Sequence, residues 1–100
     1  GTGTTQNTVT IRFTTLLIPG VVINIQDTAG NSILSYKISK YAYYLLVSLP
    51  ALTTGTTYNV YTGGSVTGTE LNGYFADGIY VPGTKKGSFT VNSALTSVVM

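Results

Sequence analysis

Short runs of β-branched and aromatic residues, each bounded by Gly, Pro, Asn or Asp, recur along this 100-residue chain. Runs of this kind are typical of β-strands, because branched and flat side chains pack well on a pleated surface and the bounding residues favour turns. Helix signals are almost absent. The pattern therefore predicts an all-β fold, and 100 residues are enough for one domain with a single core.

The first two expected strands span residues 8–17 and 21–26. Alternation of side chains along a strand places Asn24 and Gln26 outward. It places these side chains inward: Val9, Ile11, Phe13, Val21, Ile23 and Ile25.

Residues 27–31, "DTAGN", predict a hairpin loop in which Gly30 takes a positive φ. The expected return strand, 32–39, points Leu34, Tyr36 and Ile38 to one side. The next segment, 41–49, is apolar on both faces, which indicates a central strand or a strand covered by a partner. Segments 85–91 and 94–100 supply the last strands.

These segments predict an immunoglobulin-like, Greek-key β-sandwich of six to seven short antiparallel strands. A parallel β-helix would require a repeat period, and the sequence has none. The spacing Leu-x-x-Gly-x-x-Tyr-x-Val at Leu52, Gly55, Tyr58 and Val60 adds a specific expectation. In immunoglobulin-like and fibronectin-like sandwiches, a tyrosine here bonds its hydroxyl back to the preceding loop, which is the tyrosine corner. Tyr58 is the candidate.

The Gly/Thr-rich start of the chain resembles a linker, so we assign residues 1–7 to a linker remnant and 8–100 to one module of a larger secreted protein. Only 8% of the residues are charged, against about 25% in soluble domains generally. A polar but uncharged surface is common among secreted and cell-surface β-modules. No apolar run approaches the roughly 18 residues of a membrane span, so we expect none.

The charge and the missing residue types exclude several functions. The net charge of +2 contains one basic doublet, Lys85-Lys86, which is too little for nucleic-acid binding. Without His or Cys the chain lacks the usual general base and thiol nucleophile. Glu70 and Asp77 are the only acids near each other, so we do not expect an enzyme. No cofactor is expected, although Asp27 with Asn31, or Asp77 with Glu70, offers oxygens for one structural calcium.

Binding is the remaining class, and polysaccharide is the ligand that tyrosine-rich loops suit best. Sugar rings pack on flat aromatic side chains while nearby polar groups hold their hydroxyls. The glycine-rich stretch 58–83 supplies candidate rings and polar partners: Tyr61, Tyr74, Phe75, Tyr80, Asn72, Asp77 and Glu70. A second cluster, Tyr41, Tyr43 and Tyr44, could form a flat platform for an extended chain. The alternative for each tyrosine is a place in the core with its hydroxyl bonded to water or backbone.

The chain resembles the C-terminal region of secreted bacterial proteins described as carbohydrate-binding domain-containing, over roughly residues 21 to 99. Three motifs carry the resemblance: a hairpin "DTAGNSILSY" (27–36), the segment "PALTTGTTYNVYTGG" (50–64), and a Gly/Tyr tail that ends in "GTKKGSFTV" (83–91). The tail departs from the family pattern at Asp77 and Pro82. The resemblance implies secretion and association with polysaccharide.

Two functions are thus expected from the sequence. The first is a non-catalytic carbohydrate-binding module that stacks sugars on tyrosines and tethers a larger secreted or cell-surface protein. The second is a structural or assembly module: an immunoglobulin-like spacer, a cap, or an adhesin domain that pairs through edge strands, including as a homodimer. Low charge favours the second, because few charged residues protect any exposed edge.

Overall fold

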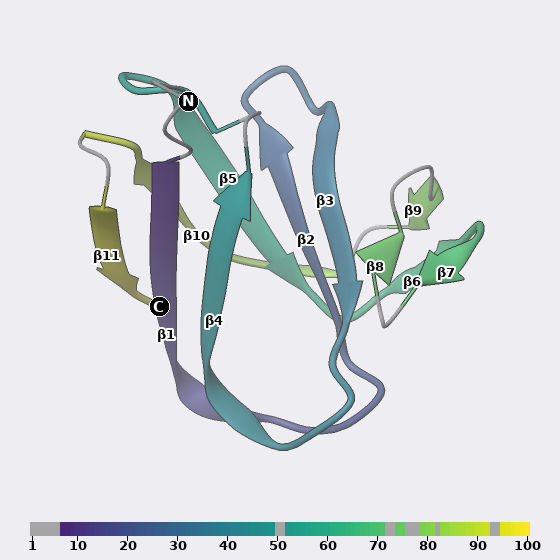
Figure 1. The fold of residues 1–100 in the computed structure, drawn as a ribbon. Coiled ribbons are helices and arrows are strands. Elements are labelled where there is room, and N and C mark those ends of the chain that lie inside the picture. Colours follow the sequence, from purple (N-terminus) through teal and green to yellow (C-terminus); the bar gives the residue numbers. More distant parts are fainter. Residues whose placement is uncertain (1–6, 50–51, 72–73, 76–78, 82, 93–94) are drawn as a thin grey trace.

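A computed structural model describes residues 7–49, 52–71, 74–75, 79–81, 83–92 and 95–100 of the chain (Figure 1). These ranges contain strands and no helix, which confirms the predicted all-β class. The strands are β1 (Asn7–Leu17), β2 (Val22–Asp27), β3 (Ser32–Lys37), β4 (Ala42–Leu49), β5 (Thr57–Thr62), β6 (Ser65–Thr67), β7 (Glu70–Leu71), β8 (Tyr74–Phe75), β9 (Ile79–Val81), β10 (Thr84–Thr90) and β11 (Leu95–Val99).

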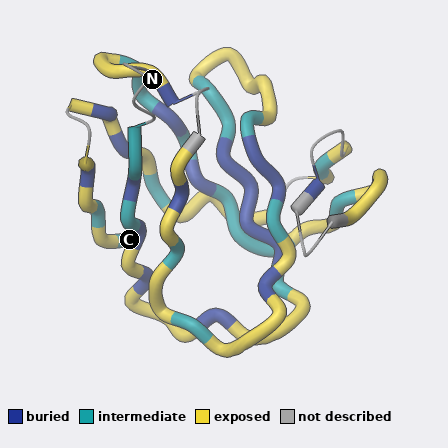
Figure 2. Tube along the Cα trace, viewed as in Figure 1, coloured by how far each residue is buried: buried dark blue, intermediate teal, exposed yellow. Residues whose placement is uncertain are grey.

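The strands form two main layers. One layer has the order β11-β1-β4, the other has the order β10-β5-β2-β3-β8-β7, and β6 pairs with β9 in a small separate ribbon (Figure 1). Buried residues lie along the strands where the layers face each other (Figure 2). The molecule is therefore a β-sandwich, with the β6–β9 ribbon at one side (Figure 1). Its immunoglobulin-like, Greek-key character stays a prediction.

The core is built by alternation, as expected. Val9, Ile11 and Phe13 of β1 are almost fully buried, and Ile23 and Ile25 of β2 pack into the same cluster. Each of these side chains lies two residues from the next along its strand, so one face of each strand supplies the interior. The inward direction predicted for these five residues is confirmed.

Tyr58 forms the predicted tyrosine corner. Its side chain is 2% exposed, and its Oη accepts a hydrogen bond of 2.9 Å from the backbone N–H of Thr53. Its ring lies 5.5 Å from that of Phe89 across the β5–β10 pair. One side chain thus ties the loop before β5 to the core, and the sequence prediction for Tyr58 is confirmed.

The hairpin between β2 and β3 is also as predicted. Gly30 has a φ of 92°, which suits glycine because it lacks a Cβ. The Asp27 carboxylate accepts hydrogen bonds from the backbone N–H groups of Ala29 and Asn31 and from Asn31 Nδ2. These bonds, the side-chain bond of Asn31 first, lower the pKa of Asp27 below its usual 3.8. The carboxylate is therefore engaged by donors of its own turn, and the structural calcium considered from the sequence stays a prediction.

Asn24 was predicted to face outward. This prediction is wrong, because the side chain is fully buried. Its Nδ2 lies 3.0 Å from the carbonyl oxygen of Leu34, 2.7 Å from Ser32 Oγ and 2.8 Å from Ser35 Oγ. Val22, on the same face of β2, is buried too. The neighbouring strand provides polar partners for the Nδ2 group, whereas the Oδ1 of Asn24 is buried without a hydrogen-bond partner among the described residues.

The prediction of a central position for residues 41–49 is wrong. These residues form β4, which lies at the edge of the three-stranded sheet, with β1 as its pairing partner. Tyr44 and Leu46, on its outer face, are 58% and 68% exposed. An apolar run on both faces indicated burial of both, but only the inner face, with Val47 in the core, is covered by the described residues, and the outer face is exposed.

Strand number and direction also differ from the prediction. The described residues form eleven strands in place of the expected six or seven, because four short ones, β6 to β9, lie between residues 65 and 81. The last strand is not antiparallel to its neighbour: β11 runs parallel to β1, from the pair Thr8↔Leu95 to the pair Arg12↔Val99. Strand β10 belongs to the other sheet, so the chain changes layers before β11 and cannot return as a hairpin. Strand β1 begins at Asn7, one residue before the predicted module boundary.

Candidate functional site

Tyr61 and Tyr80 come together beside the small ribbon. Their ring centroids are 6.5 Å apart with planes tilted by 57°, and both side chains are partly exposed. Tyr61 lies on β5, where Lys85 of β10 is its register partner. Since β9 carries Tyr80, the ring contact joins the ribbon to the six-stranded sheet.

The hydroxyl of Tyr80 is used inside the protein. It donates a hydrogen bond of 2.7 Å to the carbonyl oxygen of Gly63 and accepts one of 3.0 Å from the N–H of Gly83. Burial raises the pKa of Tyr80 above its usual 10.0, and the nearby Tyr61 adds to this, while the bond from Gly83 opposes it. The hydroxyl therefore stays protonated at neutral pH and holds two loops together, which gives Tyr80 a structural role.

The other predicted ligand residues of this stretch are less defined. Asn72 and Asp77 lie outside the described residues. Tyr74 is placed in β8, where its backbone pairs with Tyr36, and its side chain is outside what the structure describes. Glu70 is exposed at the start of β7. Phe75, the fourth candidate ring, is only 8% exposed, so it is part of the interior and not a surface platform.

The second tyrosine cluster is on the surface. Tyr41, Tyr43 and Tyr44 are 68%, 48% and 58% exposed at the start of β4. The Arg12 guanidinium carbon lies 5.8 Å from the Tyr44 ring centroid, a distance at which a cation is attracted to the ring face. We refer to Tyr41, Tyr43 and Tyr44 as the β4 tyrosine cluster.

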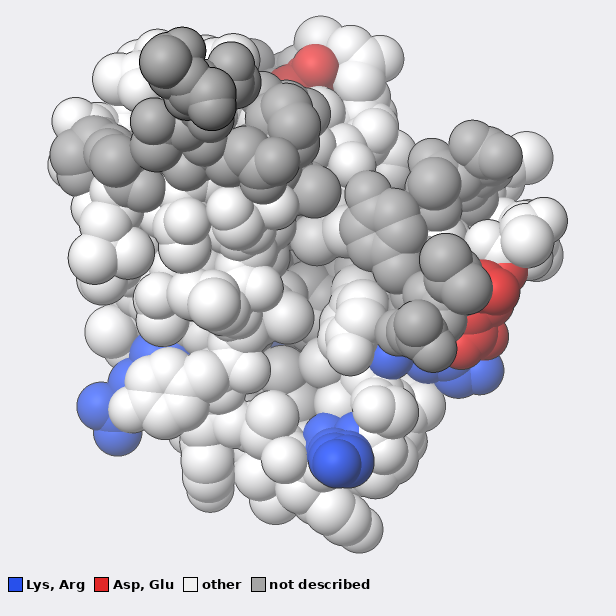
Figure 3. All heavy atoms as spheres, in the orientation of Figure 1, with Lys and Arg blue, Asp and Glu red and all other residues white. Residues whose placement is uncertain are grey.

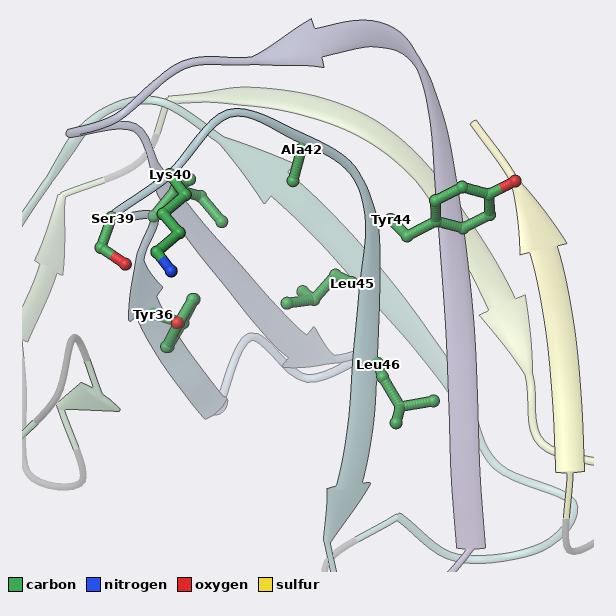
Figure 4. Close-up of a pocket in the computed structure, with 8 residues that line it drawn as sticks. Tyr36, Ser39, Lys40, Ala42, Tyr44, Leu45 and Leu46 are labelled. Carbon is green, nitrogen blue, oxygen red and sulfur yellow. The ribbon is translucent and has the colours of Figure 1, made fainter.

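A groove of about 200 Å³ runs between the end of β3 and the edge of β4 (Figure 4). It opens beside the β4 tyrosine cluster, and Figure 4 shows Lys40 and Tyr36 on one side and Leu45 of β4 pointing toward them, whereas Tyr44 and Leu46 point to the other side of β4. Its lining residues are Tyr36, Ile38, Ser39, Lys40, Ala42, Tyr44, Leu45 and Leu46. We call this the β3–β4 groove. Its described lining residues include one cation, Lys40, and no carboxylate.

The surface around these features carries little charge. Figure 3 shows a largely uncharged face on which the cations gather in the lower half. Within the described ranges, no group of three or more His, Cys, Asp or Glu side chains could hold a metal ion. The same ranges contain no helix with the length and hydropathy that a membrane crossing requires.

Sequence reasoning gave the β4 tyrosine cluster second place and missed the groove. The sequence contained a signal for this surface, since segment 41–49 is apolar on both faces. A strand at the edge of a sheet exposes one of its faces or both. What the sequence did not supply was the strand order, and the groove exists because β4 is at an edge.

Fold and surface together define a class: a small β-sandwich with an aromatic surface beside an open groove. Comparison with protein-family models, curated proteins and solved structures finds no match for this chain. The resemblance to carbohydrate-binding domain-containing proteins therefore stays a prediction.

Proposed function

We propose that this chain is a non-catalytic carbohydrate-binding module of a secreted protein and that it binds an extended polysaccharide on the β4 tyrosine cluster. The supporting observation is the exposure of Tyr41, Tyr43 and Tyr44, each about half exposed or more. Tyrosine rings are large and partly apolar, so a protein gains by covering them. Tyr41 and Tyr43 supply the contact area for sugars in this proposal, whereas Tyr44 lies on the opposite face of β4, where Arg12 contacts its ring.

Sugar rings stack on these side chains through their C–H faces. Tyr41 and Tyr43 are two residues apart and project to the same side of the chain, where they can contact successive sugars of a linear polymer. Lys40 and Ser39, which line the adjoining groove, supply donors for sugar hydroxyls. Affinity of one module is weak, and linked modules in a larger protein strengthen it by avidity.

The loop residues contribute a second, smaller surface in this proposal. Tyr61 is partly exposed and is braced from the side by Tyr80, so its ring is held in place before a ligand arrives. Glu70 is exposed on the same stretch, with Asn72, Asp77 and Tyr74 as further predicted contacts. Tyr80 acts here through Tyr61, because its own hydroxyl is occupied.

Affinity electrophoresis against a panel of soluble polysaccharides, with pull-down on insoluble ones, tests the proposal. We expect retardation on at least one glycan and its loss in the double variant Tyr41→Ala/Tyr43→Ala, with about three- to tenfold weaker binding for each ring removed. Matched variants Tyr41→Phe/Tyr43→Phe keep the rings and should keep most of the binding.

Glu70→Gln and Tyr61→Ala separate the two surfaces. Binding that survives the β4 variants but is lost with Tyr61→Ala would move the site to the loop stretch. Failure of the wild-type protein to bind any glycan at high loading would contradict the proposed function altogether.

A further inference from the structure

Strand β4 has one edge without a partner strand. It pairs with β1 along one side, and no described strand pairs with the other side from Ala42 to Val47. Such an edge offers a row of backbone donors and acceptors to any extended chain. Proteins normally protect it with charged residues, proline or a bulge. The segment 42–49 contains no charged residue, no proline and no glycine.

The unpaired edge lies directly beside the β3–β4 groove. Tyr36 and Leu45 on the groove walls are only partly buried, although both pack against the hydrophobic core. The groove occurs because the three-stranded layer ends at β4 while the opposite layer continues to β3 and beyond (Figure 1). One further strand beside β4 would lie over β3. Alternate side chains of that strand would enter the groove (Figure 4).

The charge of the groove indicates what kind of strand fits. Lys40 lines it at the end where β4 begins, and none of the lining residues that the structure describes is acidic. Two acids are described: Asp27 lies at the opposite end of β3, roughly 20 Å away along a six-residue strand, and Glu70 lies on β7, separated from β3 by β8, and does not line the groove. Asp27 is also held by its own turn. An incoming strand with a carboxylate near Lys40 would supply the missing charge.

We propose that the β4 edge and the β3–β4 groove form a strand-addition site for an extended peptide of another protein, bound antiparallel to β4. The peptide has small apolar side chains at alternate positions and an acidic residue near its C-terminal end, next to Lys40. Backbone hydrogen bonds to the β4 edge supply much of the affinity, and the groove with Lys40 supplies selectivity. This site shares Lys40 and Ser39 with the proposed glycan surface but differs from it in chemistry, because glycan stacking needs no backbone pairing.

A second copy of the chain fits less well. Antiparallel pairing of two β4 edges about Leu45 sets Tyr44 opposite Leu46 and leaves the residues opposite Lys40 without a carboxylate, since β4 and its flanks contain none. The cation in the groove would stay unpaired. Charge complementarity therefore favours a foreign acidic strand over self-pairing.

The test uses the full chain and a ten-residue synthetic peptide of alternating valine and threonine, with glutamate next to an amidated C-terminus. Binding is measured by fluorescence anisotropy, and the contact is mapped by amide chemical shifts. We expect saturable binding with shifts gathered in residues 36–47. Lys40→Gln should weaken binding of the glutamate peptide about two- to fivefold. It should not change binding of a control peptide in which glutamine replaces the glutamate.

Two matched variants and a modified peptide test the geometry. Leu46→Glu, at an exposed position that lines the groove, should reduce binding at least tenfold, whereas Leu95→Glu, a comparably exposed leucine on β11, should not. N-methylation of every second peptide residue should abolish binding in one register and spare it in the other, because only alternate N–H groups of the peptide face β4.

Several results would overturn the proposal. These are no saturable binding up to the solubility limit of the peptide, equal binding by Leu46→Glu and wild type, or indifference to both N-methylated registers. Light scattering provides a further one: a dimer that Leu46→Glu converts to monomer and that excludes the peptide would assign the β4 edge to a second copy.

Discussion

The hydroxyl of Tyr58 allows the sharpest test of how this fold is held together. Replacing Tyr58 by Phe keeps the buried ring and its contact with Phe89 at 5.5 Å, and removes the Oη, which accepts the 2.9 Å bond from Thr53 N–H and lies 3.3 Å from Thr53 Oγ1. Loss of one partner of a partly buried hydrogen bond costs about 1–3 kcal/mol. The Thr53 side chain is exposed, so water can reach part of the loop, and we expect a value near the lower end, about 1.5 kcal/mol.

The assay is urea denaturation followed by tyrosine fluorescence, with thermal unfolding by circular dichroism. A change of about 1.5 kcal/mol lowers the melting temperature of a domain this size by roughly 6–12 °C. Tyr44→Phe is the matched control, because it removes the same hydroxyl from a ring that is 58% exposed. Its stability should stay within about 0.5 kcal/mol of wild type.

A free energy of unfolding for Tyr58→Phe within about 0.3 kcal/mol of the wild-type value, at an unchanged denaturant slope, would contradict this role of the Tyr58 hydroxyl. A similar loss in Tyr44→Phe would also contradict it, since the effect would then belong to tyrosine hydroxyls in general and not to the corner.

Three further predictions concern backbone space, pH and a buried amide. Gly83→Ala should lower the melting temperature strongly in differential scanning calorimetry, because its Cβ would overlap the backbone at residues 62–64; Gly87→Ala meets only a flexible methionine side chain and should be tolerated. Asp27→Asn should be less stable than wild type near pH 6, and denaturation at several pH values should show this difference disappearing on acidification. The folded pKa of Asp27 is lowered, so the stabilisation by its carboxylate is present above pH 3.8 and is lost as pH falls through the folded pKa. Asn24→Asp would bury a carboxylate and remove two donors, so we expect a loss of about 3 kcal/mol or more at pH 7 and a smaller one at pH 4.5, both from urea titrations.

Local patterns predicted well the parts of this fold whose causes are local. Alternation in residues 8–17 gave the buried face of β1, since the period of a strand depends only on its own geometry. The tyrosine corner followed from a spacing of a few residues, Leu52 to Tyr58, that places a hydroxyl against its own loop. Gly30 in the hairpin is a third example.

Features that depend on which strands become neighbours could not be predicted in this way. Alternation shows which face of 94–100 is apolar but not that β1 lies beside it in parallel. The burial of Asn24 depends on Ser32 and Ser35 on the next strand. The edge position of β4, and hence the β3–β4 groove, depends on where a sheet ends.

The candidate ligand residues show the same division. Aromatic and polar residue types indicated a binding surface, but type alone does not separate Tyr80, whose hydroxyl is bonded twice inside the protein, from Tyr41, which is 68% exposed. Exposure depends on contacts distant in sequence.

The parallel pairing of β1 with β11 also determines how the molecule carries mechanical load. A pull on the chain before Asn7 and after Met100 draws the two strands in opposite directions along their length. The five register pairs from Thr8↔Leu95 to Arg12↔Val99, with the bond from Met100 N to Arg12 O at 2.8 Å, are then loaded together in shear. A hairpin pulled at its open end separates one pair at a time and yields at lower force. Terminal strands arranged in this way resist separation under force, a useful property in any module that links a moving body to a fixed surface.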